Sequence, residues 1–299
     1  MQNGAGLELL TTAEAATYLR LRERKLYELI AERQIPCTKV TGKWLFSRAD
    51  LDRWLLAGMA RPPGLAPAEP PPIVGGSHDP LLQWALAESR AGLAILPEGS
   101  QAGYQRFLKG EVVAAAIHFH ALDGRQSDAN LEVVRQEPSL YDAVLLGFAA
   151  REQGLLVASG NPLGLTGLSQ AQQQRVRLAV RPDGAGAQQL LLSLLRREDL
   201  TLADFSRTEL APTGPDVAQA IRAERADCGI ATRAVANAAG VGFLPLCLER
   251  FDLLLRQRDY FRPPWQHLVT FLGDARFAAQ ANELGGFDVS AAGQVRWAP

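Results

Sequence analysis

The sequence has 299 residues, a formal net charge of −1 and 47% hydrophobic residues. This length allows two domains with a sizeable core, and the near-neutral charge excludes a protein that binds polyanions over its whole surface. The chain contains no run of eighteen apolar residues and no basic-then-apolar leader, so a cytoplasmic protein without a membrane partner is expected. Three widely spaced cysteines fit a reducing compartment and form no zinc pattern.

Residues 1–57 are predicted to form a small DNA-binding domain. Thr11 or Thr12 precedes a helical pattern in TAEAATYLR, and a second follows in RERKLYELIAERQ. Two short extended runs flank Thr41-Gly42, which is typical of a hairpin. Ser47 then precedes a third helix, which ends at Gly58. This order predicts a winged helix-turn-helix.

Positive charge is concentrated in this domain. Between Arg20 and Arg48 there are eight lysines and arginines and three acidic residues. Such a local excess is typical of a nucleic-acid-binding surface. The alternative is a basic helix face that meets only solvent, with Tyr27 and Trp44 packed in a small core.

Residues 9–55, LLTTAEAATYLRLRERKLYELIAERQIPCTKVTGKWLFSRADLDRWL, closely resemble the excisionase-like branch of the MerR-type DNA-binding domains. The resemblance implies that the second helix enters the major groove of double-stranded DNA, while the hairpin wing lies along the backbone or the minor groove. Arginine suits guanine edges and phosphates, and lysine suits phosphates. The positions carried over are Arg22, Arg24, Lys25, Tyr27 and Arg33 for the groove, and Lys39, Thr41, Lys43 and Trp44 for the wing.

Residues 58–72 are rich in proline, which is typical of an extended, semi-stiff linker. Residues 73–299 alternate apolar extended runs with amphipathic helical patterns, which predicts an α/β fold with a mostly parallel sheet. Ligands of such sheets bind at the carboxyl ends of strands, beside helix N-termini. The second part of the chain is therefore expected to bind a small molecule.

Small-residue turns connect several of these predicted strands and helices: GGSHD (75–79), PEGSQAG (97–103), SGNP (159–162), RPDGAGAQ (181–188) and APTGPD (211–216). Their backbone N–H groups and hydroxyls predict a cradle for an anion. Ser77-His78-Asp79 is not expected to be a catalytic triad, because triad members converge from separate parts of a fold. Ser77 is expected to contact the anion, and Ser77 or Asp79 to cap the following helix.

Segments across residues 73–297, including GSHDPLL, EGSQAG, GEVVAAAIHFH, REQGLLVASGNP, RPDGAGAQQLL and FLPLCLERFDLLL, resemble the periplasmic-binding-protein-like domain. This domain occurs in cytoplasmic regulators and is fused to molybdopterin-biosynthesis enzymes. The resemblance implies a two-lobed type II clam, with lobe 1 about 73–157 and 247–299, lobe 2 about 158–246, and molybdate or tungstate in the cleft. The ligand-binding positions carried over are Ser77, His78, Ser100, His118, Asn161, Arg181, Gly184, Ala185, Gly186 and Thr213.

The sequence departs from the pattern of this family at two of the turns. The usual glycine-serine-glycine-threonine-arginine loop is replaced by residues 184–188, GAGAQ. This loop lacks the two hydroxyls, and Gln188 stands in place of the positively charged arginine. Gly214 follows Thr213 where the family often has a histidine. Because an arginine–oxyanion pair is a strong contact, its loss leaves the identity of the anion open.

Several of these positions also have a structural interpretation. His118 and His120 share one strand face, but no cysteine or carboxylate has matching metal-ligand spacing, so no metal is predicted. The alternatives are a local hydrogen bond for His118, packing or capping for His78, a surface ion pair for Arg181 and a turn for Asn161. The core or an interface is expected to hold Trp84, Trp265 and Trp297.

The sequence therefore predicts a one-component, ligand-responsive transcription regulator that forms a dimer or tetramer. Its partners are double-stranded DNA and a small anion, molybdate or tungstate being the effector; no catalytic cofactor is expected. Closure of the clam would reposition the DNA-binding domains on operator half-sites. One alternative is an enzyme of molybdenum-cofactor metabolism tethered to DNA, although no paired acids or converging nucleophile and base are present. Another is an architectural DNA-binding protein that senses no ligand.

Overall fold

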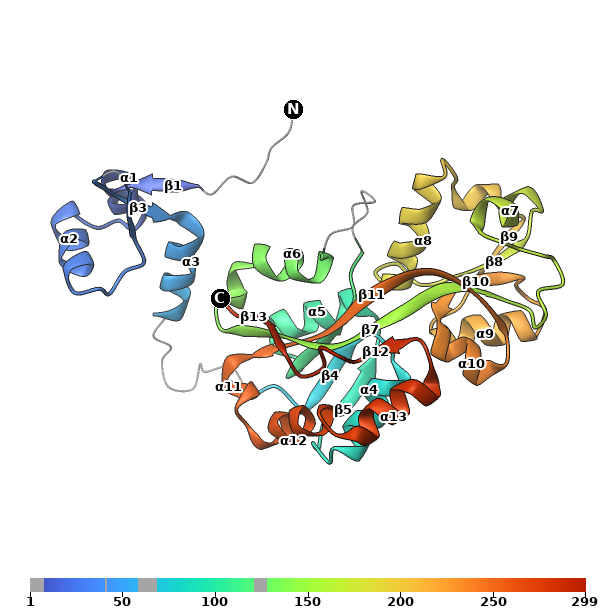
Figure 1. Ribbon diagram of the computed structural model, residues 1–299. Coiled ribbons are helices and arrows are strands. Elements are labelled where there is room, and N and C mark those ends of the chain that lie inside the picture. Colours follow the sequence, from blue (N-terminus) through green and yellow to red (C-terminus); the bar gives the residue numbers. More distant parts are fainter. Residues whose placement is uncertain (1–7, 41, 59–68, 121–127) are drawn as a thin grey trace. The chain divides into compact units, whose positions relative to one another are not determined.

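The structure is a computed structural model that describes residues 8–40, 42–58, 69–120 and 128–299 (Figure 1). These residues form two units. One contains the described residues up to 58, called the head, together with Gln136–Tyr141; the other, the body, contains the remaining described residues from 69 onward. Thr41 and most of the predicted linker lie outside the described residues.

The described part of the head contains helices and a small antiparallel sheet with the strand order β1-β3-β2. The predicted helix, turn, helix, hairpin and helix are all present. The first strand was not predicted, because three residues are too few to show an alternating pattern. The elements are β1 (Leu9–Thr11), α1 (Thr12–Tyr18), α2 (Glu23–Ala31), β2 (Thr38–Val40), β3 (Lys43–Ser47) and α3 (Arg48–Ala57).

A capping box fixes the start of α1. The Glu14 backbone N–H donates to Thr11 Oγ1 at 3.4 Å, and the Thr11 N–H donates to Glu14 Oε2 at 2.8 Å. These bonds satisfy N–H groups that have no partner inside the helix. The core of the head is formed mainly by residues of α1, α2, β3 and α3. Its buried members are Ala15, Ala16, Leu26, Leu29, Ile35, Phe46 and Leu51.

The first lobe of the body contains short parallel strands, β4 between β5 and β6. Helix α4 begins at an Asp79 cap, whose Oδ1 accepts from the Leu82 N–H at 2.9 Å, so Asp79 rather than Ser77 caps this helix. The elements of this lobe are β4 (Ile73–Gly76), α4 (Pro80–Glu88), β5 (Ala94–Pro97), α5 (Ser100–Lys109), β6 (Ala114–Ile117), α6 (Ala129–Gln136), α11 (Gln257–Tyr260), α12 (Pro263–Leu272), α13 (Ala275–Leu284), β12 (Phe287–Asp288) and β13 (Val295–Trp297). The short helix η1 (Pro138–Leu140) belongs to the first unit.

The second lobe also has parallel strands, β8 between β9 and β10. Helices α8, α9 and α10 begin at or after the ends of these strands, as the alternation in the sequence predicts. The elements are α7 (Leu168–Gln173), β8 (Arg177–Val180), α8 (Gly186–Arg197), η2 (Leu202–Asp204), β9 (Arg207–Leu210), α9 (Gly214–Arg222), β10 (Cys228–Thr232) and α10 (Arg233–Ala239).

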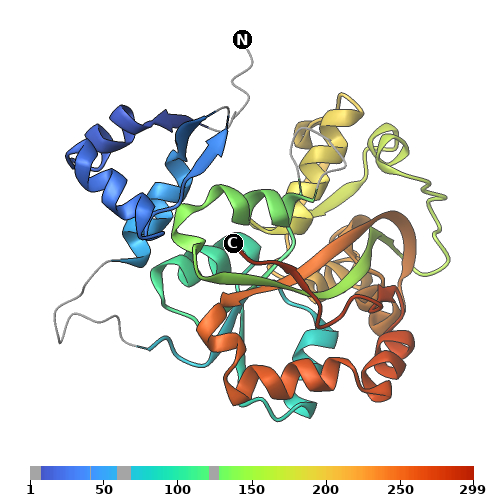
Figure 2. The same cartoon turned by 60° about the vertical axis from the view of Figure 1, so that its left-hand side comes forward.

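Two long strands join the lobes, β7 (Ala143–Val157) and β11 (Gly242–Arg256). They pair antiparallel along their length, and they run side by side from one lobe to the other in both views (Figures 1 and 2). The body sheet therefore has the order β5-β4-β6-β11-β7-β10-β8-β9. Its two parallel sets match the prediction, whereas the antiparallel pairs at its centre were not predicted.

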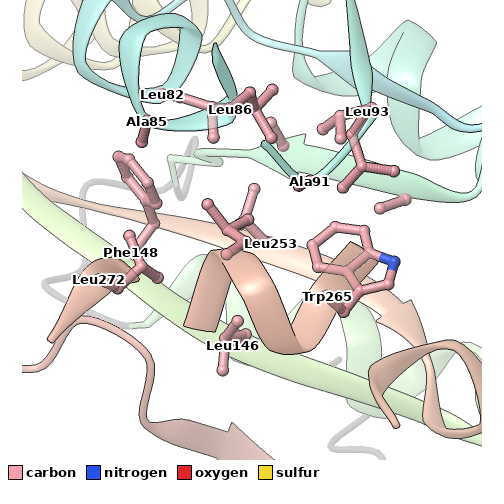
Figure 3. Close-up of a cluster of buried hydrophobic side chains, with 14 of the residues drawn as sticks. Leu82, Ala85, Leu86, Ala91, Leu93, Leu146, Phe148, Leu253, Trp265 and Leu272 are labelled. Carbon is pink, nitrogen blue, oxygen red and sulfur yellow. The ribbon is translucent and has the colours of Figure 1, made fainter. Parts of the chain in front are cut away.

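The largest buried cluster of the first lobe lies between the sheet and helices α4, α12 and α13 (Figure 3). Trp265 is fully buried in it, beside Leu253 and Leu146, and Trp84 packs against Phe271 with ring centroids 5.4 Å apart. These two tryptophans are core residues, while Trp297 is half-buried in β13. Among the helices of the described residues, none combines the length and apolarity that crossing a membrane requires.

Glycines allow α5 to pack closely on the end of β4. A Cβ atom at Gly103 would lie 2.4 Å from Gly76 Cα, which is far inside van der Waals contact. Gly76 itself has a φ of +127°, a conformation that side chains disfavour. The paired glycines of the GGSHD turn thus bring the N-terminus of α5 against the strand end.

Candidate ligand-binding cleft and DNA-binding surface

The cleft lies where β7 and β11 pass between the lobes. Both strands are largely apolar, but Arg151 and Gln153 on β7 and Glu249 on β11 are buried at this point. The sheet register pairs Arg151 with Glu249. Since buried charges are costly unless they are paired, these residues mark a polar site.

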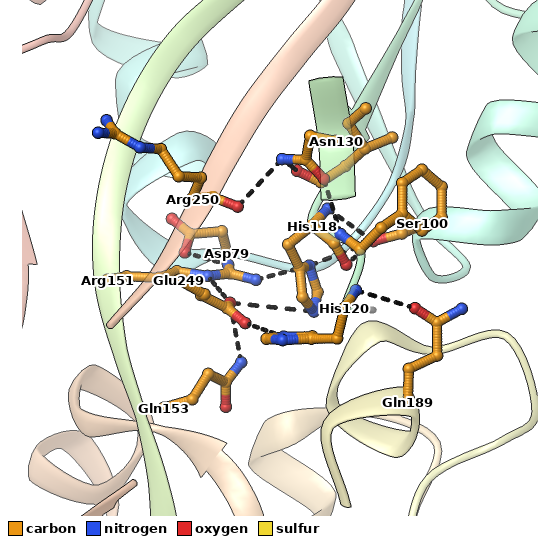
Figure 4. Close-up of polar contacts among 12 residues, drawn as sticks. Asp79, Ser100, His118, His120, Asn130, Arg151, Gln153, Gln189, Glu249 and Arg250 are labelled. Carbon is orange, nitrogen blue, oxygen red and sulfur yellow. Dashed lines mark hydrogen bonds and ion pairs between the residues drawn. The ribbon is translucent and has the colours of Figure 1, made fainter. Parts of the chain in front are cut away.

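Arg151 is held by two carboxylates (Figure 4). Its Nε donates to Glu249 Oε1 at 2.5 Å, and its Nη1 donates to Asp79 Oδ2 at 2.7 Å. Its guanidinium also lies over the Phe251 ring, 4.0 Å from the centroid. Asp79 both caps α4 and binds Arg151, so the GGSHD turn is fixed to the central strands.

Glu249 accepts hydrogen bonds from three side chains. In addition to Arg151, Gln153 Nε2 donates to Oε1 at 3.0 Å, and His120 Nε2 lies 2.7 Å from Oε2. Burial alone would raise the pKa of Glu249, but the rings of His118 and His120 and the Arg151 guanidinium outweigh it and hold this pKa well below the ordinary range. Glu249 is therefore ionised and acts only as an acceptor.

His118 is oriented by Ser100 and Arg151. Ser100 Oγ accepts from the His118 backbone N–H at 3.0 Å and also lies 3.2 Å from Nδ1. Arg151 Nη2 lies 2.8 Å from the same Nδ1. Burial is the main cause that lowers the pKa of His118 well below its ordinary value, so the ring is neutral at pH 7. Because arginine can only donate, Nδ1 is the acceptor and the proton resides on Nε2.

Four buried polar atoms around the cleft have no hydrogen-bond partner among the described residues: His118 Nε2, Gln153 Oε1, Arg181 Nε and Thr232 Oγ1. All four side chains line one cavity of about 20 Å³. Because buried polar groups are nearly always paired in folded proteins, this concentration of unpaired groups indicates a ligand site.

The N-terminal ends of α8 and α9 and the residue before α5 border the same cavity. Gly186 and Ala187 begin α8, and Gly214 begins α9; all three line the cavity, as does Gly99 before α5. The first N–H groups of a helix have no partner inside it, and the helix dipole favours an anion there.

Arg181 is the cation of the second lobe at this cavity. Its Nη2 donates to the Pro212 carbonyl at 2.9 Å, and its backbone N–H donates to Gln188 Oε1 at 2.9 Å. Burial lowers the pKa of Arg181 to about 10, so the side chain stays positively charged at pH 7. Gln188, which stands where the family usually has arginine, thus braces the turn that carries Arg181.

The structure brings together many of the predicted ligand residues. Ser77, His78, His118, Arg181, Ala185 and Gly186 line the cavity. Ser100 contacts His118, with its Oγ 3.2 Å from Nδ1. The Gly184 carbonyl accepts from the N–H of Gln101, the residue after Ser100, at 3.3 Å.

Two of the predicted residues have other positions. Thr213 caps α9, and its hydroxyl donates to Asp216 at 2.6 Å. Asn161 Nδ2 donates to the Leu165 carbonyl at 2.8 Å, in a turn with φ +49°, and this residue does not line the cavity. Its turn interpretation fits this position.

The prediction missed Arg151, Gln153, Thr232 and Glu249. A signal was present in the sequence, because polar residues interrupt two long apolar runs, LLGFAAREQGLLV and FLPLCLERFDLLL. Among the described residues, no group of three or more histidine, cysteine or acidic side chains is arranged to hold a metal.

The predicted DNA-binding residues lie on the surface of the head. Arg22, Arg24, Lys25, Arg33, Lys39 and Lys43 are exposed, and Tyr27 is 49% exposed, so Tyr27 is not a core residue. Trp44 is partly buried against the core, and Lys39 Nζ lies 5.2 Å from its ring centroid. Thr41 lies outside the described residues. One face of α2 and the wing are therefore available for contact with phosphates.

The fold and the cleft define a two-lobed binding domain attached to a helix-turn-helix domain. The chain belongs to the PBP superfamily, whose domain model matches residues 83–273. A helix-turn-helix domain model matches residues 9–59.

Known proteins are similar to this chain in sequence or in fold. The chain is 21% identical over 306 residues to the uncharacterized protein YvgK of Bacillus subtilis, covering 95% of this chain and 96% of that protein. The tungstate ABC transporter of Geobacter sulfurreducens has the same fold, with a TM-score of 0.51 and 14% identity over 71% of this chain and 98% of that chain. OxyR of Corynebacterium glutamicum is also similar, with a TM-score of 0.48 and 12% identity over 92% of this chain and 89% of that chain.

Proposed function

We propose that the protein is a one-component transcription regulator, in which the head binds operator DNA and the cleft binds a small oxyanion that changes this binding. The observation that carries the proposal is the set of unpaired buried atoms of His118, Arg181 and Thr232 around one cavity, beside the helix N-termini of α8 and α9. Donors of this kind are suited to an anion of a few atoms. The family resemblance and the tungstate transporter fold favour a tetrahedral oxyanion, the class to which molybdate and tungstate belong, as the effector.

The lobes are closed on each other, which suggests how binding is coupled to motion. The Gln101 N–H of α5 donates to the Gly184 carbonyl at 3.3 Å, and the His120 N–H donates to Gln189 Oε1 of α8 at 3.4 Å. The cavity is lined by residues of both lobes, so an oxyanion bound in it contacts both. An oxyanion that bridges both lobes then favours closure, and closure changes how the heads of a dimer or tetramer fit two operator half-sites.

Gly186 makes closure testable. A Cβ atom at this position would lie 2.2 Å from His118 Nε2 and 2.3 Å from the His118 carbonyl oxygen, across the cleft. Gly186→Ala therefore obstructs closure. Gly167→Ala is the matched control, because a Cβ atom there meets nothing within 4 Å and the backbone is extended.

The experiment uses DNA fragments selected by the full chain from a random pool. Mobility shifts and thermal melting are measured with molybdate, tungstate, sulfate, phosphate and arsenate. We expect at least one oxyanion to raise the melting temperature and to change DNA affinity in the unmodified protein and in Gly167→Ala, and to do neither in Gly186→Ala. If no oxyanion alters melting or DNA binding, the proposed function is wrong, and an architectural role is favoured.

The enzyme alternative has one feature in its support, the contact between Ser100 Oγ and His118 Nδ1. A serine nucleophile requires that this nitrogen take the hydroxyl proton. However, Nδ1 already accepts from Arg151, and Ser100 is fully buried. This geometry favours a positioning role for Ser100.

A further inference from the structure

The cleft contains an acceptor among its donors, which restricts the kind of oxyanion that fits. Gln153 is 2% exposed, and its Nε2 donates to Glu249 Oε1 at 3.0 Å. Glu249 is ionised and accepts from Arg151 at the same oxygen. A carboxylate can only accept, so the amide nitrogen must face it and Gln153 Oε1 must point away from it (Figure 4).

Gln153 Oε1 therefore presents fixed lone pairs to the cavity. It has no partner among the described residues. The sheet register places Thr232 directly opposite Gln153, so the hydroxyl of Thr232 and this acceptor lie on the same face of neighbouring strands. A ligand atom that contacts both residues must donate to Gln153 and can accept from Thr232.

We propose that the effector is an oxyanion that carries a proton, and that its O–H group donates to Gln153 Oε1 while its other oxygens accept from His118 Nε2, Thr232 Oγ1 and Arg181 Nε. This inference rests on the proposed function and narrows its ligand class. Phosphate and arsenate retain a proton throughout the neutral pH range. Sulfate, molybdate and tungstate carry no proton in this range. One of their oxygens would therefore face Gln153 Oε1 with no hydrogen between the two acceptor atoms.

The charges around the cavity agree with this choice. Arg151 is compensated by both Asp79 and Glu249, at 2.7 and 2.5 Å. Arg181 has an unpaired N–H at the cavity. The site thus relies on hydrogen-bond direction more than on net positive charge. Sites built in this way reject ligands that leave a buried polar group unpaired.

The test is isothermal titration of the full chain in a buffer free of oxyanions, at one pH near 7 and constant ionic strength. Phosphate and arsenate are expected to bind about 10- to 100-fold more tightly than sulfate, molybdate and tungstate. This ranking needs no variant.

Two variants assign the preference to Gln153. Gln153→Leu removes the acceptor and is expected to reduce the preference for phosphate over sulfate about tenfold or more. Gln174→Leu is the control, because Gln174 Nε2 also donates one hydrogen bond, to the Leu163 carbonyl at 3.1 Å, but on an exposed turn. Melting curves report whether each variant is folded.

The outcomes separate the two proposals. If sulfate, molybdate or tungstate binds as tightly as phosphate, the protonated-oxyanion inference is overturned while the regulator stands. An unchanged preference in a folded Gln153→Leu variant overturns it as well. If none of the five oxyanions binds, the proposed oxyanion sensor fails, and this inference fails with it.

Discussion

The cations of the head and those of the cleft have opposite environments. The side chain of Arg24 on α2 is 92% exposed, and its partner Glu28 is 3.4 Å away on the next helical turn. The side chain of Arg151 in the cleft is 1% exposed and has two carboxylate partners. Exposed ion pairs contribute little to stability, whereas a buried cation without its partners is strongly destabilising.

This difference indicates two modes of anion recognition in one chain. The head offers exposed, hydrated charges that suit a long polyanion and a salt-dependent interaction. In the cleft, the charge of Arg151 is balanced within the protein, where its guanidinium also orients the His118 ring. The groups left for a ligand are the neutral donors of His118 and Thr232, the acceptor oxygen of Gln153 and the N–H of Arg181. Substitution of a cation should therefore affect DNA affinity in the head and folding stability in the body.

The largest effect is expected for Arg151→Met. It leaves Asp79 and Glu249 buried without their cation, so the free energy of unfolding of the body should fall by about 3–5 kcal/mol. Arg197→Met on the exposed end of α8 is the control and should change it by less than about 0.5 kcal/mol. Calorimetric unfolding of the full chain measures both. Similar values for the two variants would contradict the central role of Arg151.

The next effect concerns the head. Arg24→Ala is expected to weaken binding to the selected DNA by about 1–3 kcal/mol if the side chain reads a base, or to reduce the slope of log affinity against log salt by about 0.9 if it contacts one phosphate. Fluorescence anisotropy at several salt concentrations distinguishes the two. Unchanged DNA affinity and slope would exclude Arg24 from the interface, and Arg197→Ala should leave both unchanged.

A smaller effect is the pH dependence of stability that His118 causes. Since the head contains no histidine, a histidine-dependent change belongs to the body. Burial lowers the pKa of folded His118 below the ordinary value of 6.5, so the unfolded chain binds more protons below pH 6.5. The free energy of unfolding of the body should thus fall with decreasing pH, by up to about 1.4 kcal/mol per pH unit between pH 6.5 and 5.

His118→Gln tests this assignment, because glutamine is neutral at every pH and can still donate into the cleft. The slope of stability against pH should become smaller in this variant. His267→Gln, on an exposed position of α12, is the control and should keep the slope of the unmodified protein. A slope that persists in folded His118→Gln would assign it to other groups, among them His78, whose pKa burial also lowers.

The sequence predicted the elements with local signals. Thr11 and Glu14 are three residues apart, and the helical spacing of Leu26 and Leu29 is visible without the fold. Strand β1 had no such signal, because its three residues are defined by pairing with β3.

The centre of the cleft could not be predicted in the same way. Arg151 binds Asp79 and Glu249, which are 72 and 98 residues away in the sequence. The antiparallel pairing of β7 with β11 places Arg151 beside Glu249, and that pairing was not predicted, while Asp79 reaches Arg151 from the N-cap of α4. The close approach of Gly186 to His118 could not be predicted either, because it connects the two lobes and exists only when they are closed.

The central claim is that oxyanion binding in the cleft and the affinity of the head for DNA are coupled. Such coupling is reciprocal, because each ligand must change the affinity of the other by the same factor. The most direct measurement is the dissociation constant of the bound oxyanion, by titration calorimetry, with and without saturating selected DNA. We predict a change of about 5- to 150-fold, equal to the factor by which the oxyanion changes DNA affinity. Identical oxyanion dissociation constants with and without DNA would contradict the account.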